Sequence, residues 1–74
     1  MTVQEARYKY GVLQTTASVG DTLTSIARRI YSSDDDIYIK VLKILNNRLD
    51  WQCVEPGAVI LYFSVSVIKQ IEEV

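Results

Sequence analysis

Few side chains in this 74-residue chain could carry out covalent chemistry. There is no histidine and only one cysteine, Cys53, which excludes a nucleophile activated by an imidazole and a zinc site of histidine and cysteine ligands. Asp21 and Glu55 could be imagined as an acid and base pair, but Asp21 directly precedes an apolar helical pattern, where aspartate commonly caps a helix. We therefore expect no catalytic residues, no metal and no cofactor, and we expect Cys53 to be a partly buried small hydrophobe rather than a reactive thiol.

The run Asp34 to Asp36 is the other group of side chains that could bind a ligand, in this case a cation. It follows Ser32 and Ser33, and serine followed by carboxylates is typical of the first turn of a helix. We favour a helix start, with Ser33 as the cap and Asp36 at the capping-box position. A cation site remains the alternative.

Charge and length limit the partners of the chain. Eight basic and nine acidic residues give a net charge of −1, which provides no field to attract nucleic acid or anionic membrane. No apolar stretch approaches the roughly 20 residues of a membrane span, and the segment from Met1 to Arg7 lacks the features of a secretory signal, so we expect a cytoplasmic chain. A chain of this size buries only about 60% of its unfolded surface, so we expect association with other subunits.

Two stretches before Gly20 alternate apolar and polar residues, which is the period of a half-buried strand. Tyr8, Tyr10 and Val12 predict an extended N-terminal arm. The residues from Leu13 to Val19 predict the first strand of the core.

Two helices are predicted next. Leu23, Ile26, Ala27 and Ile30 recur at helical spacing after Asp21, and this helix is expected to end near Tyr31. In the second helix the predicted apolar stripe is Ile37, Val41, Ile44 and Leu45, widened by Tyr38 and Leu42. Asn46 and Asn47 are expected to end it, because asparagine tolerates the left-handed conformation at helix C-termini.

The last third of the chain predicts a turn, a strand and an arm. Pro56 and Gly57 fit the central positions of a type II turn, from which a strand at 58–63 follows. Both faces of that strand are apolar, so its outer face needs a cover, either the chain's own arms or a neighbouring subunit. The β-branched segment 64–74 could supply an edge strand, to this sheet or to a partner's.

Two motifs together resemble the LysM module. They are the segment from Gly20 to Ala27, a tight turn that caps a helix, and the segment from Glu55 to Leu61, a turn that begins a strand. The resemblance spans Val12 to Phe63. It implies an α+β fold, a LysM-like β-α-α-β module, in a single domain of residues 1–74 with a core at 12–63, an N-terminal arm at 1–11 and a C-terminal arm at 64–74, both of which can add strands.

The resemblance also implies a groove in which LysM modules hold N-acetylglucosamine polymers. Its walls here would be Gly20, Asp21, Thr22 and Leu23 on one side, and Asn47, Arg48, Leu49, Asp50 and Trp51 on the other. Backbone amides and short polar side chains could bond acetamido groups while Trp51 packs on a sugar ring. We favour the alternative in which Trp51 and Leu49 anchor the loop to the core or to a neighbour.

Glycan-binding LysM modules usually occur as exported repeats joined to an enzyme or receptor, whereas this unit is single and has extra arms. It resembles instead the small LysM-like proteins of phage tails, the tail protein X and baseplate types. This implies a virion structural protein of a bacteriophage tail or contractile injection system, located in the tail or baseplate and, during assembly, in the host cytoplasm. Its partners would be hub, tube, wedge or sheath-initiating subunits. Candidate contact residues are Tyr8, Tyr10, Ile60, Tyr62, Val65 and Val67. Alternatives are a peptidoglycan- or chitin-binding module, and a cytoplasmic scaffold or sensor.

Overall fold

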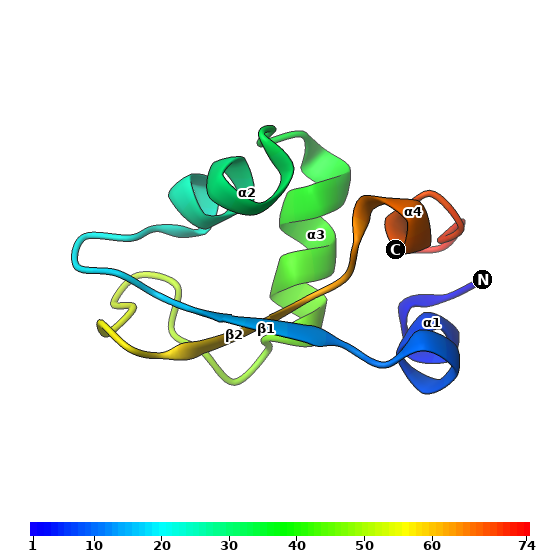
Figure 1. Cartoon of the computed structure of the whole chain (residues 1–74), viewed down its shortest axis with the longest axis horizontal. Coiled ribbons are helices and arrows are strands. Elements are labelled where there is room, and N and C mark those ends of the chain that lie inside the picture. The colour runs from blue at the N-terminus through cyan, green and yellow to red at the C-terminus, as the bar shows by residue number, and fades with distance from the viewer.

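The order of helices and strands confirms the predicted β-α-α-β core (Figure 1). The computed structural model describes residues 1–74 and contains, in chain order, α1 (Val3–Tyr10), β1 (Leu13–Thr16), α2 (Leu23–Tyr31), α3 (Asp36–Leu45), β2 (Val59–Tyr62) and α4 (Val65–Ile68). The two strands form an antiparallel sheet in which Leu13 is opposite Tyr62 and Thr16 is opposite Val59. The terminal helices α1 and α4 lie together at one end of the molecule.

The N-terminal arm is a helix, so the predicted extended arm is wrong. Thr2 caps α1 by accepting a hydrogen bond from the Glu5 backbone N–H, and the Glu5 carboxylate accepts one from the Thr2 N–H. Gly11, at φ 70°, ends the helix in a conformation that glycine adopts easily. The spacing of the buried Val3 and Ala6, rather than the alternation around the 95% exposed Tyr8, determines the local structure.

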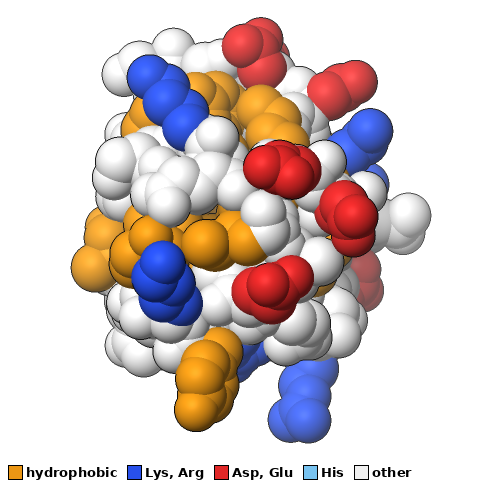
Figure 2. All heavy atoms as spheres, turned by 90° about the vertical axis from the view of Figure 1, so that its right-hand side faces the viewer, with side chains coloured by type: hydrophobic (Ala, Val, Ile, Leu, Met, Phe, Trp, Pro, Cys, Tyr) orange, Lys and Arg blue, Asp and Glu red, His pale blue; other side chains and the backbone are white.

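The C-terminal arm adds no strand to the chain's own sheet, so that part of the prediction about the arms is wrong. It forms α4 and then pairs with the N-terminus. The Met1 amino group donates to the Gln70 carbonyl at 3.0 Å, and the Glu72 N–H donates to the Met1 carbonyl at 2.9 Å. The Tyr10 hydroxyl donates to Gln70 Oε1 at 2.8 Å. Figure 2 shows this end of the molecule, where acidic side chains gather along one side of a band of hydrophobic ones.

Both core helices begin later than predicted, α2 by one residue and α3 by two. The cap of α2 is Thr22, which exchanges capping-box hydrogen bonds with Ser25, and not Asp21. Ser32 takes the left-handed conformation at φ 56° and ends α2 after Tyr31, as predicted. Ser33 and Asp34 belong to the connection between the two helices, and α3 starts at Asp36 without a side-chain cap. Only Asp36 of the acidic run therefore lies in the first turn of α3.

The core lies between the inner face of the sheet and helices α2 and α3. Its largest fully buried side chains are Phe63, Ile26, Leu42, Ile60 and Val41. The buried stripe of α3 is Val41, Leu42 and Leu45, so the predicted stripe is rotated and Ile44 is 40% exposed. Tyr31 stacks on Tyr38 with ring centroids 4.5 Å apart, which extends the core toward the start of α3.

The outer face of β2 is covered at one end only. Phe63, at the end that leads to α4, is 1% exposed, Leu61 is partly buried, and Val59 is 53% exposed. The chain itself therefore provides part of the cover that the two-sided apolar strand requires. The end that carries Val59 is left open.

Tyr31 makes the stability of this core sensitive to high pH. Its hydroxyl donates to the Phe63 carbonyl at 2.8 Å, and burial raises the pKa of Tyr31 to about 12, because the phenolate would lose its hydration. An unfolded tyrosine titrates near 10, so the folded state holds the proton more tightly, and this stabilisation is lost as the pH rises from about 10 toward 12. We expect the free energy of unfolding to fall over that range more steeply in the native chain than in a Tyr31→Phe variant.

Urea unfolding at a series of pH values measures this difference. At neutral pH the Tyr31→Phe substitution should cost about 1 kcal/mol, the net contribution of one hydrogen bond. Tyr8→Phe, at an exposed position, is the control and should follow the native curve. Parallel curves for the native chain and Tyr31→Phe would contradict the role assigned to the buried hydroxyl.

Candidate functional site

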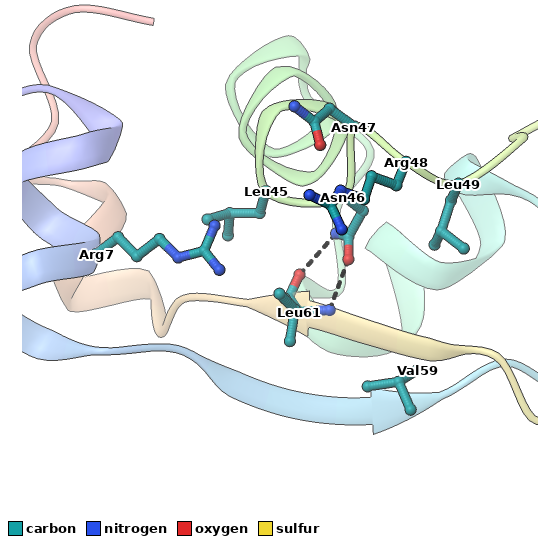
Figure 3. A pocket seen from close by; sticks show the side chains of 8 residues that line it. All are labelled: Arg7, Leu45, Asn46, Asn47, Arg48, Leu49, Val59 and Leu61. Carbon is teal, nitrogen blue, oxygen red and sulfur yellow. Dashed lines mark hydrogen bonds between the residues drawn. The ribbon is translucent and has the colours of Figure 1, made fainter.

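A depression of about 600 Å³ lies between the C-terminal end of α3 and the exposed side of β2 (Figure 3). Its lining residues come from α1, from the end of α3 with the loop after it, and from β2: Arg7, Leu45, Asn46, Asn47, Arg48, Leu49, Val59 and Leu61. Apolar side chains and potential hydrogen-bond donors therefore meet in one place.

Asn46 holds this site together. It is the one buried polar residue of the chain, at the C-terminal boundary of α3. Its side-chain amide donates to the carbonyls of Leu42 and Leu61, both at 2.8 Å, and its Oδ1 accepts from the Leu61 N–H at 2.8 Å. The amide thus engages both backbone groups that Leu61 turns away from β1, as a third strand would.

Val59 leaves the same edge of β2 open. In an antiparallel pair, backbone groups alternate between facing the partner strand and facing away from it. Ala58 bonds to Ala17 across the sheet and Leu61 faces Asn46, so the register turns the backbone N–H and C=O of Val59 away from β1. No side chain or backbone group of the chain bonds to them. An exposed, unpaired position of this kind can accept an extended segment.

Two exposed arginines border the depression. Arg7 extends from α1 and Arg48 from the loop after α3, and both guanidinium groups turn toward its middle (Figure 3). The two ion pairs of the chain lie elsewhere, between Arg28 and Asp34 and between Arg29 and Asp21. The arrangement offers two cationic groups without an ion-pair partner beside four hydrophobic side chains, which suits a ligand with both anionic and apolar parts.

The first predicted wall of a glycan groove lies outside this depression. Gly20 is in an exposed turn, Thr22 caps α2 and Leu23 is buried in the core. Asp21 accepts hydrogen bonds from the Ser18 N–H and the Ser25 hydroxyl, and it pairs with Arg29 at 2.6 Å. Glu55 is not among its partners.

The second predicted wall divides into two groups. Asn47, Arg48 and Leu49 line the depression, whereas Asp50 and Trp51 do not. Leu49 and Trp51 are partly buried against the core, which is the position that an anchoring role requires. The indole N–H of Trp51 is buried without an acceptor. No cavity in the structure includes residues of both predicted walls.

The predicted contact residues differ in how much surface they offer. Tyr8 and Tyr10 are exposed on α1, while Tyr62, Val65 and Val67 are partly buried. Ile60 is fully buried under the helices, because the register turns its side chain inward, and it has no surface for a neighbour. The cysteine expectation is also corrected, since Cys53 is exposed in the loop before β2.

Asn46 and Arg7 are the site residues that sequence reasoning missed. The sequence indicates only a helix end at Asn46, and a pattern cannot show that its amide reaches a strand fifteen residues away. The alternating tyrosines place Arg7 in an extended arm. The signal for its true position was present, because Thr2 and Glu5 have the spacing of a capping box.

Comparison with known proteins adds no relative, as no family model, curated protein or solved structure matches the chain. None of the four helices has both the length and the apolar character needed to span a bilayer. No group of three or more acidic or cysteine side chains is arranged to hold a metal ion.

We predict that Asn46→Ala lowers the free energy of unfolding by roughly 2–4 kcal/mol, because it leaves partly buried backbone groups of Leu61 without partners. Urea unfolding followed by circular dichroism measures the loss. Asn47→Ala is the matched control at the neighbouring exposed position, and it should change stability by no more than about 0.5 kcal/mol. Equal effects of the two substitutions would contradict the role of Asn46.

Asp21 predicts a second dependence on pH, at the acidic end. The hydrogen bond from the Ser18 N–H, and then the contact with Arg29, hold the pKa of Asp21 below its usual value of 3.8. The resulting stabilisation is present above the unfolded pKa and is lost as the pH falls through the folded pKa. Asp21→Asn should therefore be less stable than the native chain at pH 7, and the difference should shrink below about pH 4.

Thermal unfolding at pH 7 and at a series of lower pH values tests this expectation. Glu55→Gln removes the same charge from an exposed side chain without hydrogen bonds in the structure, and it serves as the control. A destabilisation by Asp21→Asn that stays constant with pH would show that the carboxylate charge is not what matters.

Proposed function

We propose that the chain is a structural component of a bacteriophage tail or contractile injection system, where it joins baseplate, hub or tube subunits through protein contacts. The β-α-α-β order supports this proposal, because it is the order implied by the resemblance to small LysM-like tail proteins. A docking role also fits a chain that offers few catalytic groups.

The observation that carries the proposal is the uncovered end of the outer β2 surface. Val59 is 53% exposed next to the depression, whereas Phe63, directly after β2, is 1% exposed. Exposed apolar side chains bordered by polar ones are typical of interaction surfaces. The unpaired backbone of Val59 provides a further point of attachment.

The terminal segments also favour β2 as the docking surface. Hydrogen bonds between Met1 and Gln70, and between Met1 and Glu72, tie the two ends of the chain to each other. The arms are therefore engaged within the chain, and docking would use the surface at β2 rather than an exchanged arm. The peptidoglycan or chitin alternative has less support, because the two predicted groove walls do not share a cavity.

We predict that Val59→Asp reduces incorporation of the chain into particles at least tenfold, because it places a charge on the apolar docking surface. The variant would be supplied to cells whose own copy of the gene is deleted, and particles would be purified and quantified by mass spectrometry. Val19→Asp is the matched control, since it makes the same change at an 86% exposed position in the turn before α2.

Circular dichroism of both purified variants establishes that they fold. Native incorporation of Val59→Asp would contradict the proposed surface. Absence of the unaltered chain from purified particles would contradict the structural role itself.

A further inference from the structure

We propose that the depression beside β2 binds an extended acidic segment of a neighbouring protein, with carboxylates on Arg7 and Arg48 and the peptide backbone on Val59. This inference deepens the proposed function and rests on it, because it assigns the chemistry of the partner at the same surface.

The arginines define the charged part of the partner. They reach the depression from elements far apart in the sequence, α1 and the loop after α3, and neither has a carboxylate partner within the chain. Arginine presents a planar fork of donors that matches a carboxylate, and such pairs are stronger than neutral hydrogen bonds. Two carboxylates on one segment would satisfy both groups.

The remaining surface defines the partner as a peptide. Leucine side chains contribute apolar surface to the depression, with Leu45 and Leu61 near the arginines and Leu49 at the side of Val59, and a small inorganic anion would leave this surface exposed. Val59 offers one backbone donor and one acceptor, the pair that an extended peptide uses when it joins a sheet edge. The backbone N–H and C=O of Leu61 are already hydrogen-bonded to the Asn46 amide. Backbone pairing with the peptide would therefore be confined to Val59, and side chains would supply the specificity.

The positions of these groups define the path of the bound segment along the depression. Figure 3 shows Arg7 at one side of the depression, Leu61 and Asn46 near the middle, and Val59 and Leu49 at the other side. A segment that pairs with Val59 would pass over Leu61 and bring its acidic residues toward Arg48 and Arg7. A net charge of −1 for the whole chain disfavours nucleic acid as the occupant, since that polyanion requires a broad basic surface.

Titration of the isotopically labelled chain with two capped peptides, followed by nuclear magnetic resonance, tests the proposal. The probes are acetyl-Ser-Asp-Val-Asp-Val-Ser-amide and the same peptide with both aspartates replaced by asparagine. We expect saturable shifts at the backbone amide of Val59 and in the loop after α3 with the acidic peptide, and binding at least tenfold weaker with the amide peptide.

Arginine variants locate the contact. Arg7→Gln and Arg48→Gln should each weaken binding of the acidic peptide at least fivefold, and added salt should weaken it further. Lys40→Gln removes the same charge from an exposed position of α3 outside the depression, and it should leave binding close to native. Equal losses in all three variants, or no saturable shifts with the acidic peptide, would overturn the proposal.

Two further comparisons separate the possible failures. Sodium acetate at the same carboxylate concentration should produce no saturable shift at Val59, and equal binding of acetate would overturn the peptide component. Particle incorporation of Arg7→Gln and Arg48→Gln should fall while that of Lys40→Gln stays native. Peptide binding by a chain that is absent from particles would contradict only the tail assignment, whereas native incorporation of arginine variants that bind no peptide would contradict only this inference.

Discussion

The fold depends on how a sheet of only two strands satisfies its edge. Asn46 replaces a third strand at one position, because its amide bonds to both outward backbone groups of Leu61 and to the last turn of α3. A buried amide is acceptable here because three hydrogen bonds compensate for its lost hydration. The same contacts fix the distance between α3 and β2, and they thereby create the depression and leave Val59 as the unpaired position next to it.

The terminal segments add buried apolar side chains to a core that is small. A chain of 74 residues has little apolar surface to bury, and both ends contribute side chains to the core, with Val3 and Ala6 from α1 and Ile68 and Ile71 from the C-terminal segment. Their mutual hydrogen bonds tie the two ends of the chain to each other at one end of the molecule. Strand β2 begins at the exposed Val59 and ends next to α4, so docking and stabilisation are assigned to opposite ends of the same strand.

The core was predictable from sequence because its signals are local. The helical spacing from Leu23 to Tyr31 is enough to predict that helix. The Pro56-Gly57 pair is likewise enough to predict the turn, in which Gly57 has φ 85° and the Ala58 N–H bonds to the Glu55 carbonyl. For the N-terminal segment the sequence carries two conflicting signals, since the alternating tyrosines favour an extended arm and the capping box at Thr2 and Glu5 favours the helix that forms. The site was not predictable, since it depends on contacts between Arg7, Asn46 and Leu61 that are distant in the chain and leave no periodic pattern.

Cryo-electron microscopy of particles purified from cells that produce this chain tests the central claim most directly. We expect density for the chain in the tail or baseplate, with the outer side of β2 at Val59 and the adjoining depression covered by another subunit. Particles that lack the chain, or that contain it with this surface facing solvent, would contradict the proposed role.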